Sequence, residues 1–135
     1  MTALMHIILH SCDFKHEEFL DLFLKNKYID LNIQDNNGMT ALMYTVVRSS
    51  ESFCQYNIET LFVTAKSHKR SLNLNLQDIQ GNTTVHMAVA FRCTNALKHL
   101  INYNADINIQ NIDGDTPAHV AVSHGFVEEL EVLIH

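Results

Sequence analysis

Leu72-Asn73-Leu74-Asn75-Leu76-Gln77-Asp78-Ile79-Gln80-Gly81-Asn82-Thr83 is a stretch that the chain repeats, with small changes, at residues 29–40 and 105–116. Each copy places a glycine two residues before a threonine, and the three glycines stand 43 and then 33 residues apart. The shorter step is one unit, and the longer step is the same unit with ten residues inserted. A local sequence that recurs at such a period indicates an array of stacked supersecondary units.

The residues of this stretch have individual physical roles. Gly38, Gly81 and Gly114 stand where a chain reversal needs a positive φ angle, which costs least without a Cβ atom. The threonines two places later stand at the entry to a helix, where a hydroxyl can accept a hydrogen bond from a backbone N–H. Pro117, the only proline, follows one of these threonines, at a position where its missing N–H costs nothing. The stretch therefore predicts a hairpin followed by a helix.

A second helix is expected in each unit. Small residues such as Ala88 and Ala121 let the first helices of neighbouring units approach each other closely. Apolar residues then recur at helical spacing in the stretches that follow. In the last two units these are Leu97, Leu100 and Ile101, and Leu130, Leu133 and Ile134.

The segments 83–89 and 116–122 carry a specific wording, Thr-Thr-Val-His-Met-Ala-Val and Thr-Pro-Ala-His-Val-Ala-Val. Together with the hairpin stretch, this wording resembles the ankyrin repeat, which runs from Asp-x-x-Gly-x-Thr-Pro-Leu-His onward with a period of about 33 residues. The resemblance covers essentially the whole chain. It implies an all-α repeat solenoid of stacked helix–turn–helix repeats joined by β-hairpin-like loops. One domain of four degenerate or partial repeats is expected, at about residues 1–34, 35–77, 78–110 and 111–135.

Several positions depart from the family pattern. The first two units read Thr-Ala-Leu-Met, and Arg92 stands where the family places a glycine that Gly125 supplies in the last unit. Inserts are expected at residues 49–57 and 66–71, and the second holds the basic cluster 66–70, either as a solvated loop or as a finger for an acidic partner. The chain starts and stops abruptly within the repeat pattern. We therefore expect a fragment of a longer array, with open ends that self-associate.

Composition narrows the class of partner. The net charge is −6, so the surface repels phosphate backbones on average, and neither nucleic acid nor membrane is expected as a partner. Apolar runs are far shorter than a membrane helix needs. Three cysteines without Cys-x-x-Cys spacing favour a reducing compartment, the cytoplasm or nucleus, or the host cytoplasm if the source is viral or bacterial.

Motifs for catalysis or metal binding are incomplete. His6 and His10 stand four residues apart, with Cys12 and His16 nearby, but the second ligand pair of a zinc site is missing. The segment after His16 begins like a metalloprotease helix, yet Leu20 occupies the place of the second histidine. The family explains His86 and His119 as residues that tie neighbouring repeats together. No enzyme activity, cofactor or metal is expected.

The resemblance implies that a protein partner binds the concave face, which is made of hairpin tips and the exposed side of the first helices. The repeat pattern leaves the identity of these positions free, and apolar residues at several of them suggest an interface with a polar rim. The alternative is that Ile79 and Ile112 pack against neighbouring hairpins. The candidate partner-binding residues are Met39, Arg48, Ile79, Gln80, Asn82, Phe91, Ile112, Asp113, Asp115 and His124.

The family resemblance leaves three roles open. The first is a protein–protein interaction module that acts as an adaptor, inhibitor or scaffold, with inhibitors of the Rel/NF-κB class as one likeness. The second is a structural segment of a longer solenoid with no partner of its own. The third makes Asn32, Asn75 and Asn108 substrates of an asparaginyl hydroxylase, as similar positions are in some ankyrin proteins.

Overall fold

The computed structural model describes residues 2–10, 16–49 and 56–135 and confirms the all-α repeat solenoid. No β-strand occurs within these ranges. Cys12 and most of the expected insert at residues 49–57 lie outside the described residues. The helices are α1 (Ala3–His10), α2 (His16–Lys25), α3 (Ala41–Ser49), α4 (Tyr56–Ser67), α5 (Thr84–Ala90), α6 (Thr94–Asn102), α7 (Pro117–His124) and α8 (Val127–Ile134).

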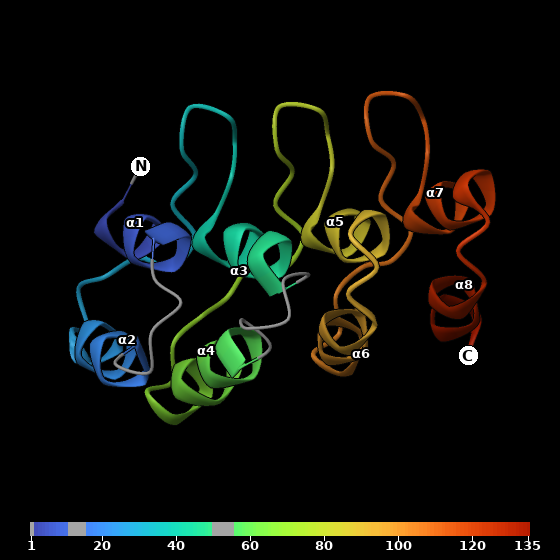
Figure 1. Cartoon of the computed structure of the whole chain (residues 1–135). Coiled ribbons are helices and arrows are strands. Elements are labelled where there is room, and N and C mark those ends of the chain that lie inside the picture. The colour runs from blue at the N-terminus through green and yellow to red at the C-terminus, as the bar shows by residue number, and fades with distance from the viewer. Residues whose placement is uncertain (1, 11–15, 50–55) are drawn as a thin grey trace.

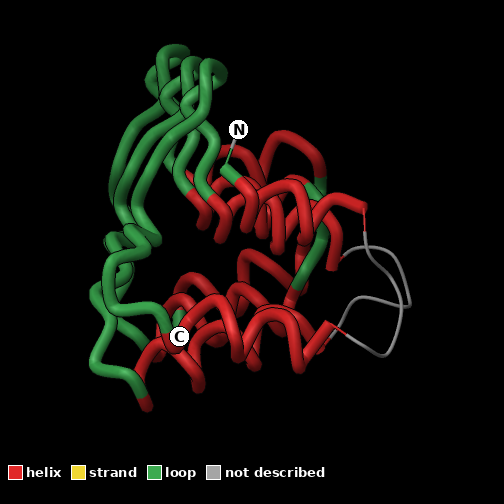
Figure 2. The backbone as a smooth tube through the Cα atoms, turned by 90° about the vertical axis from the view of Figure 1, so that its left-hand side faces the viewer, coloured by secondary structure: helices red, strands yellow, loops and turns green. Residues whose placement is uncertain are grey.

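The helices form two layers (Figure 1). The first helices of the units, α1, α3, α5 and α7, lie side by side in one layer, and the second helices, α2, α4, α6 and α8, lie below them. Three long loops at residues 29–40, 72–83 and 105–116 stack beside each other like fingers (Figure 2). We call these loops hairpins 1, 2 and 3. One antiparallel helix pair falls within each of the four units expected from the sequence.

The core fills the space between the two layers. The predicted residues Leu97 and Leu100 are completely buried, and Ile101 is half-buried. Ala88 and Ala121 are also buried, which is consistent with the close approach of neighbouring first helices. The last unit is covered less completely. There Leu133 is buried and Leu130 half-buried, whereas Ile134 remains 67% exposed.

The threonines start the first helices as the sequence predicts. Thr83 forms a capping box, in which its hydroxyl accepts from the amide of His86 and its own amide donates to Nδ1 of the same imidazole. Thr116 and His119 repeat this arrangement. In the Thr-Ala-Leu-Met unit, the amide of Thr40 donates to the sulfur of Met43 at 3.4 Å. A thioether is a weak acceptor, so this unit keeps the geometry with a weaker bond.

The imidazole of His86 also joins two repeats. Its Nε2–H donates to the backbone carbonyl of Asp115 at 2.9 Å, because Nδ1 is occupied as an acceptor by the Thr83 amide. Burial lowers the pKa of His86, and this effect outweighs the Asp115 carbonyl and the carboxylates of Asp78 and Asp115, which favour the charged form. The predicted link between repeats is thus present at His86, in its neutral form. His119 is exposed instead.

This geometry predicts that stability falls in mild acid. The folded pKa of His86 lies below its ordinary value of 6.5, so the unfolded chain binds the proton more readily. Neutral His86 therefore contributes to the free energy of unfolding in full above pH 6.5. This contribution is lost as the pH falls from 6.5 through the lower pKa that His86 has in the folded chain. We expect urea unfolding to show a free energy of unfolding that falls as the pH is lowered from neutral through this range.

Two glutamine variants isolate the contribution of His86. Glutamine can keep a capping box but does not titrate, so His86→Gln should flatten the acid limb of the stability profile. His119→Gln changes the equivalent cap at an exposed position and should leave that limb intact. An unchanged acid limb in His86→Gln would assign the pH dependence to other groups.

The structure corrects the position of the basic cluster. Lys66 and Ser67 form the last turn of α4, so only the remainder of the cluster lies in a loop. Lys69 has a φ angle of 52°, and Asn104, at the equivalent position after α6, has a φ angle of 62°. The connection from Lys69 to hairpin 2 is two residues longer than the connection from Asn104 to hairpin 3, and the additional residues are Arg70 and Ser71.

Arg92 also takes over the role of a glycine. It has a φ angle of 56°, and Gly125 at the equivalent position of the last unit has 69°, so arginine adopts the backbone conformation of the family glycine.

Candidate functional site

Each hairpin turn is held by one side-chain oxygen. Asp35, Asp78 and Asn111 use Oδ1 to accept from the amides two and four residues further along the chain, at 2.9–3.0 Å. In each turn, the amide of the glycine donates to the backbone carbonyl of this aspartate or asparagine. All three glycines have φ angles between 74° and 81°. The repeated wording of the sequence therefore encodes three copies of one rigid turn.

Backbone hydrogen bonds lock the hairpins to one another. The amide of Ile79 donates to the carbonyl of Asn37, and the amide of Ile112 donates to the carbonyl of Gln80, both at 3.0 Å. These bonds place equivalent tip residues in register along the array. Because backbone groups make these contacts, the side chains of Ile79 and Ile112 are left on the surface.

Amide side chains below the tips add further links. The Nε2 of Gln34 donates to the Gln77 carbonyl at 2.8 Å, and the Nε2 of Gln77 donates to the Gln110 carbonyl at 3.0 Å. The side-chain oxygens of Asn32 and Asn75 accept backbone amides from the next hairpin. These two asparagines thus join repeats, and their modification by a hydroxylase stays a prediction.

The ten candidate residues differ in exposure. The side chains of Ile79 and Ile112 are 66% and 72% exposed, so they are not buried between hairpins. Asn82 is tied between hairpins, because its Oδ1 accepts from the Nδ2 of Asn111 at 3.1 Å. The exposed candidates are Ile79, Gln80, Phe91, Ile112, Asp113 and His124, and the half-buried ones are Met39, Arg48, Asn82 and Asp115.

The candidates form two groups. Seven of them lie at or next to the hairpin tips, whereas Arg48, Phe91 and His124 lie at the far ends of the first helices. A first helix starts directly after its hairpin and runs away from it (Figure 2), so eight residues separate the groups by about 12 Å. A surface that includes both groups must also include the face of the first helices between them.

Tyr44 was not predicted from the sequence, although it lies beside the tip group. It lies in α3, is half-buried, and its hydroxyl donates to Oδ2 of Asp35 in hairpin 1. The sequence pointed to Tyr44 only through its position four residues after the cap residue Thr40. The equivalent position in α5, four residues after Thr83, is occupied by Met87. Tyr44 thus fastens the turn of hairpin 1 to the helix below it.

Electrostatics support this contact. Partial burial, followed by the hydrogen bond and the negative charge of Asp35, raises the pKa of Tyr44 to about 12. Burial acts on Asp35 as well, but the hydrogen bonds from Tyr44 and from the amides of Met39 and Asn37 outweigh it and lower the pKa of this carboxyl. Asp35 is therefore ionised and Tyr44 neutral at physiological pH.

The helix-end group has a different character. Phe91 is 45% exposed and caps the end of α5, where its amide donates to the carbonyl of Met87. The ring of His124 stacks on Phe126 with centroids 5.2 Å apart, and its Nδ1 contacts the Val120 carbonyl at 2.9 Å. Phe91 and His124 both remain exposed at the ends of their helices.

Comparison with known proteins identifies the repeats. Residues 85–134 match the family model described as ankyrin repeats (many copies). Residues 85–134 contain ankyrin repeats. No curated protein matches the chain. Ankyrin repeats are generally protein–protein interaction modules, and their family is typically non-enzymatic.

Two further features of the described residues bear on other functions. Within residues 2–10, 16–49 and 56–135, no group of three or more histidine, cysteine or acidic side chains is placed to hold a metal ion. In the same ranges, no helix is long and apolar enough to cross a membrane.

Proposed function

We propose that this ankyrin repeat array binds a folded protein through a surface formed by the hairpin tips and the exposed side of the first helices. The observation that carries the proposal is the state of Ile79 and Ile112. Their amides donate to backbone carbonyls of the preceding hairpin at 3.0 Å, while the two residues are 66% and 72% exposed. Apolar side chains that are presented on a rigid backbone lose little conformational entropy when a partner covers them.

The negative charge near this surface favours a partner with basic residues. Asp113 is exposed beside Ile112, and the half-buried Asp115 follows it in hairpin 3. The chain as a whole carries a net charge of −6. We expect the partner to present an apolar strip with basic residues at its edge, because complementary charge favours encounter and correct register.

A folded partner would need a surface larger than the tip group. A standard interface buries about 800 Å² on each side, which corresponds to roughly 20–30 residues. The tip group alone supplies seven candidates, so such an interface extends over Tyr44 and Ala90 toward Phe91 and His124. The identity of the partner decides between two roles. The chain could recruit the partner, as an adaptor does, or block it, as an inhibitor of the Rel/NF-κB class does.

The test compares two double variants in quantitative affinity capture from cell lysate, followed by mass spectrometry. Ile79→Asp with Ile112→Asp places two charges in the middle of the tip surface. We expect partners captured by the unchanged protein to be depleted at least tenfold, because two carboxylates would be desolvated in the interface. The midpoint of thermal unfolding should change little, since both side chains are largely exposed.

Val127→Asp with Ile134→Asp is the matched control. It removes two similarly exposed apolar side chains, 64% and 67%, from the second-helix layer. This variant should retain the partners. Equal capture by the tip variant and the unchanged protein would contradict the proposed surface. Absence of any specific partner would favour a purely structural segment.

A further inference from the structure

Lysine and arginine side chains gather at the ends of α2 and α4. The chain holds nine such residues, and five of them, Lys25, Lys27, Lys66, Lys69 and Arg70, occur in the last turns of these helices or directly after them. The four lysines are exposed and Arg70 is half-buried. His68 is exposed beside them. We call these six residues the basic corner.

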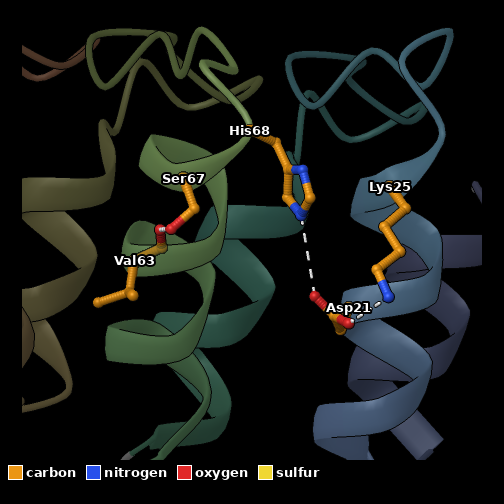
Figure 3. A network of polar contacts seen from close by, with 5 residues as sticks. All are labelled: Asp21, Lys25, Val63, Ser67 and His68. Atoms are coloured by element: carbon orange, nitrogen blue, oxygen red, sulfur yellow. Dashed lines mark hydrogen bonds and ion pairs between the residues drawn. The ribbon is translucent and has the colours of Figure 1, made fainter.

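The fold brings the two halves of the corner together. Asp21 in α2 lies 3.0 Å from the Nζ of Lys25 and 3.8 Å from the Nε2 of His68 after α4 (Figure 3). The loops that follow are also joined, because the Nδ2 of Asn32 donates to the carbonyl of Ser71 at 3.1 Å. Cations that are about forty residues apart in the sequence therefore share one surface.

Stabilisation of helix ends explains only part of this arrangement. Cations in a last turn interact favourably with the helix dipole, which accounts for Lys25 and Lys66. Lys27, Lys69 and Arg70 lie beyond the helices. The other second helices lack such a group, since the last turn of α6 contains only His99 and that of α8 has no basic residue. The corner is thus a property of this chain and not of the repeat.

Exposed apolar side chains border the cations on the same helices. Leu22 and Val63 are 62% and 53% exposed, and each precedes a lysine of the corner by three residues, so they share its helix face. Tyr28 is 83% exposed, and the Nζ of Lys27 lies 5.2 Å from the centre of its ring. Asp21 already contacts Lys25 and His68, and the remaining cations of the corner lie next to exposed apolar side chains. This combination fits a polypeptide that alternates acidic and apolar residues.

We propose that the basic corner docks a short acidic segment of a protein, with carboxylates on the cations and large apolar side chains on Leu22 and Tyr28. Nucleic acid and anionic membranes fit less well. Such extended polyanions would meet the remaining surface of a chain whose net charge is −6, including Asp30 in hairpin 1 and Asp106 in hairpin 3. A short segment needs only local complementarity. The corner lies away from the hairpin tips, so this inference is independent of the proposed function.

The test measures binding of a fluorescein-labelled peptide in which glutamates alternate with leucine and phenylalanine. Lys66→Glu with Lys69→Glu reverses two exposed cations and should weaken binding at least tenfold. Lys98→Glu reverses an exposed lysine of α6 outside the corner and should leave affinity within about twofold. A peptide with glutamine in place of glutamate should bind at least tenfold more weakly than the acidic peptide.

Amide chemical shifts provide the second readout. Addition of the peptide should shift the amides around residues 25–28 and 66–71 and leave those of the hairpin tips in place. Three results would each overturn the inference: no binding by the unchanged protein, equal weakening by Lys98→Glu, or shifts confined to the tips. Tighter binding of single-stranded DNA or phosphatidylserine vesicles than of the peptide would overturn the assignment to a protein segment. The variant Ile79→Asp with Ile112→Asp should bind the peptide normally.

Discussion

Gly81→Ala should lower the free energy of unfolding by about 3 kcal/mol, the sum of backbone strain and overpacking. Gly81 has a φ of 77°, a conformation that costs alanine about 1 kcal/mol or more. A Cβ atom there would also lie 2.8 Å from the amide nitrogen of Ile112 and 3.0 Å from the Cα of Asn111. Both are backbone atoms, so relief requires hairpin 3 to move away from hairpin 2.

Gly114→Ala is the matched control for this prediction. Gly114 has a similar φ of 81°, but among the described residues other than Gly114 and its two chain neighbours, no heavy atom lies within 4 Å of the position that its Cβ would occupy. We expect a loss of about 1 kcal/mol from the backbone term alone. Urea unfolding of both variants measures the difference, and hydrogen exchange at the Ile112 amide reports whether its bond to Gln80 is lost. Equal losses in the two variants would show that hairpin contact contributes nothing.

Glu129→Leu should raise the free energy of unfolding by about 1–2 kcal/mol, because a buried charge is exchanged for an apolar side chain of similar size. The side chain of Glu129 is 1% exposed in α8. Its Oε1 accepts from the hydroxyl of Thr94 at 3.2 Å and lies 3.7 Å from the Nε of Arg92, while Oε2 is buried without a hydrogen-bond partner. The arginine is 59% exposed, so water screens its attraction.

Glu128→Leu serves as the control, since Glu128 is exposed on the same helix turn. Its substitution should change the free energy of unfolding by less than about 0.5 kcal/mol. Chemical denaturation of both variants gives the comparison. A loss of stability in Glu129→Leu would mean that the pair with Arg92 outweighs the cost of burying the carboxylate. The equivalent position in the preceding unit is the buried Ala96, which is consistent with an apolar site.

The sequence allowed the hairpins and helix starts to be predicted in detail because their interactions are local. The oxygen of Asp78 reaches amides only two and four residues away, and Thr83 reaches the amide three residues away. Such contacts depend on residue type and spacing alone. For the same reason, the positive φ angles at the three turn glycines followed from the repeated wording.

The candidate surface was less predictable. Exposure of Ile79 could not be read from the sequence, because the same residue would be buried if the hairpins packed side chain against side chain. The hydrogen bond from its amide to Asn37 decided this, and it joins residues 42 positions apart. Tyr44 was missed because its contact with Asp35 depends on the angle at which the hairpin leaves the helix.

The sequence by itself thus determined the repeat, its turn chemistry and the helical, layered fold, since each depends on interactions within one unit. Only the tertiary structure decided what the units present together. Stacking split the candidate residues into a tip group and a helix-end group, buried Glu129 beside α6, and placed cations from two helices at one corner. These features depend on the register between neighbouring units, which arises from packing of the complete array.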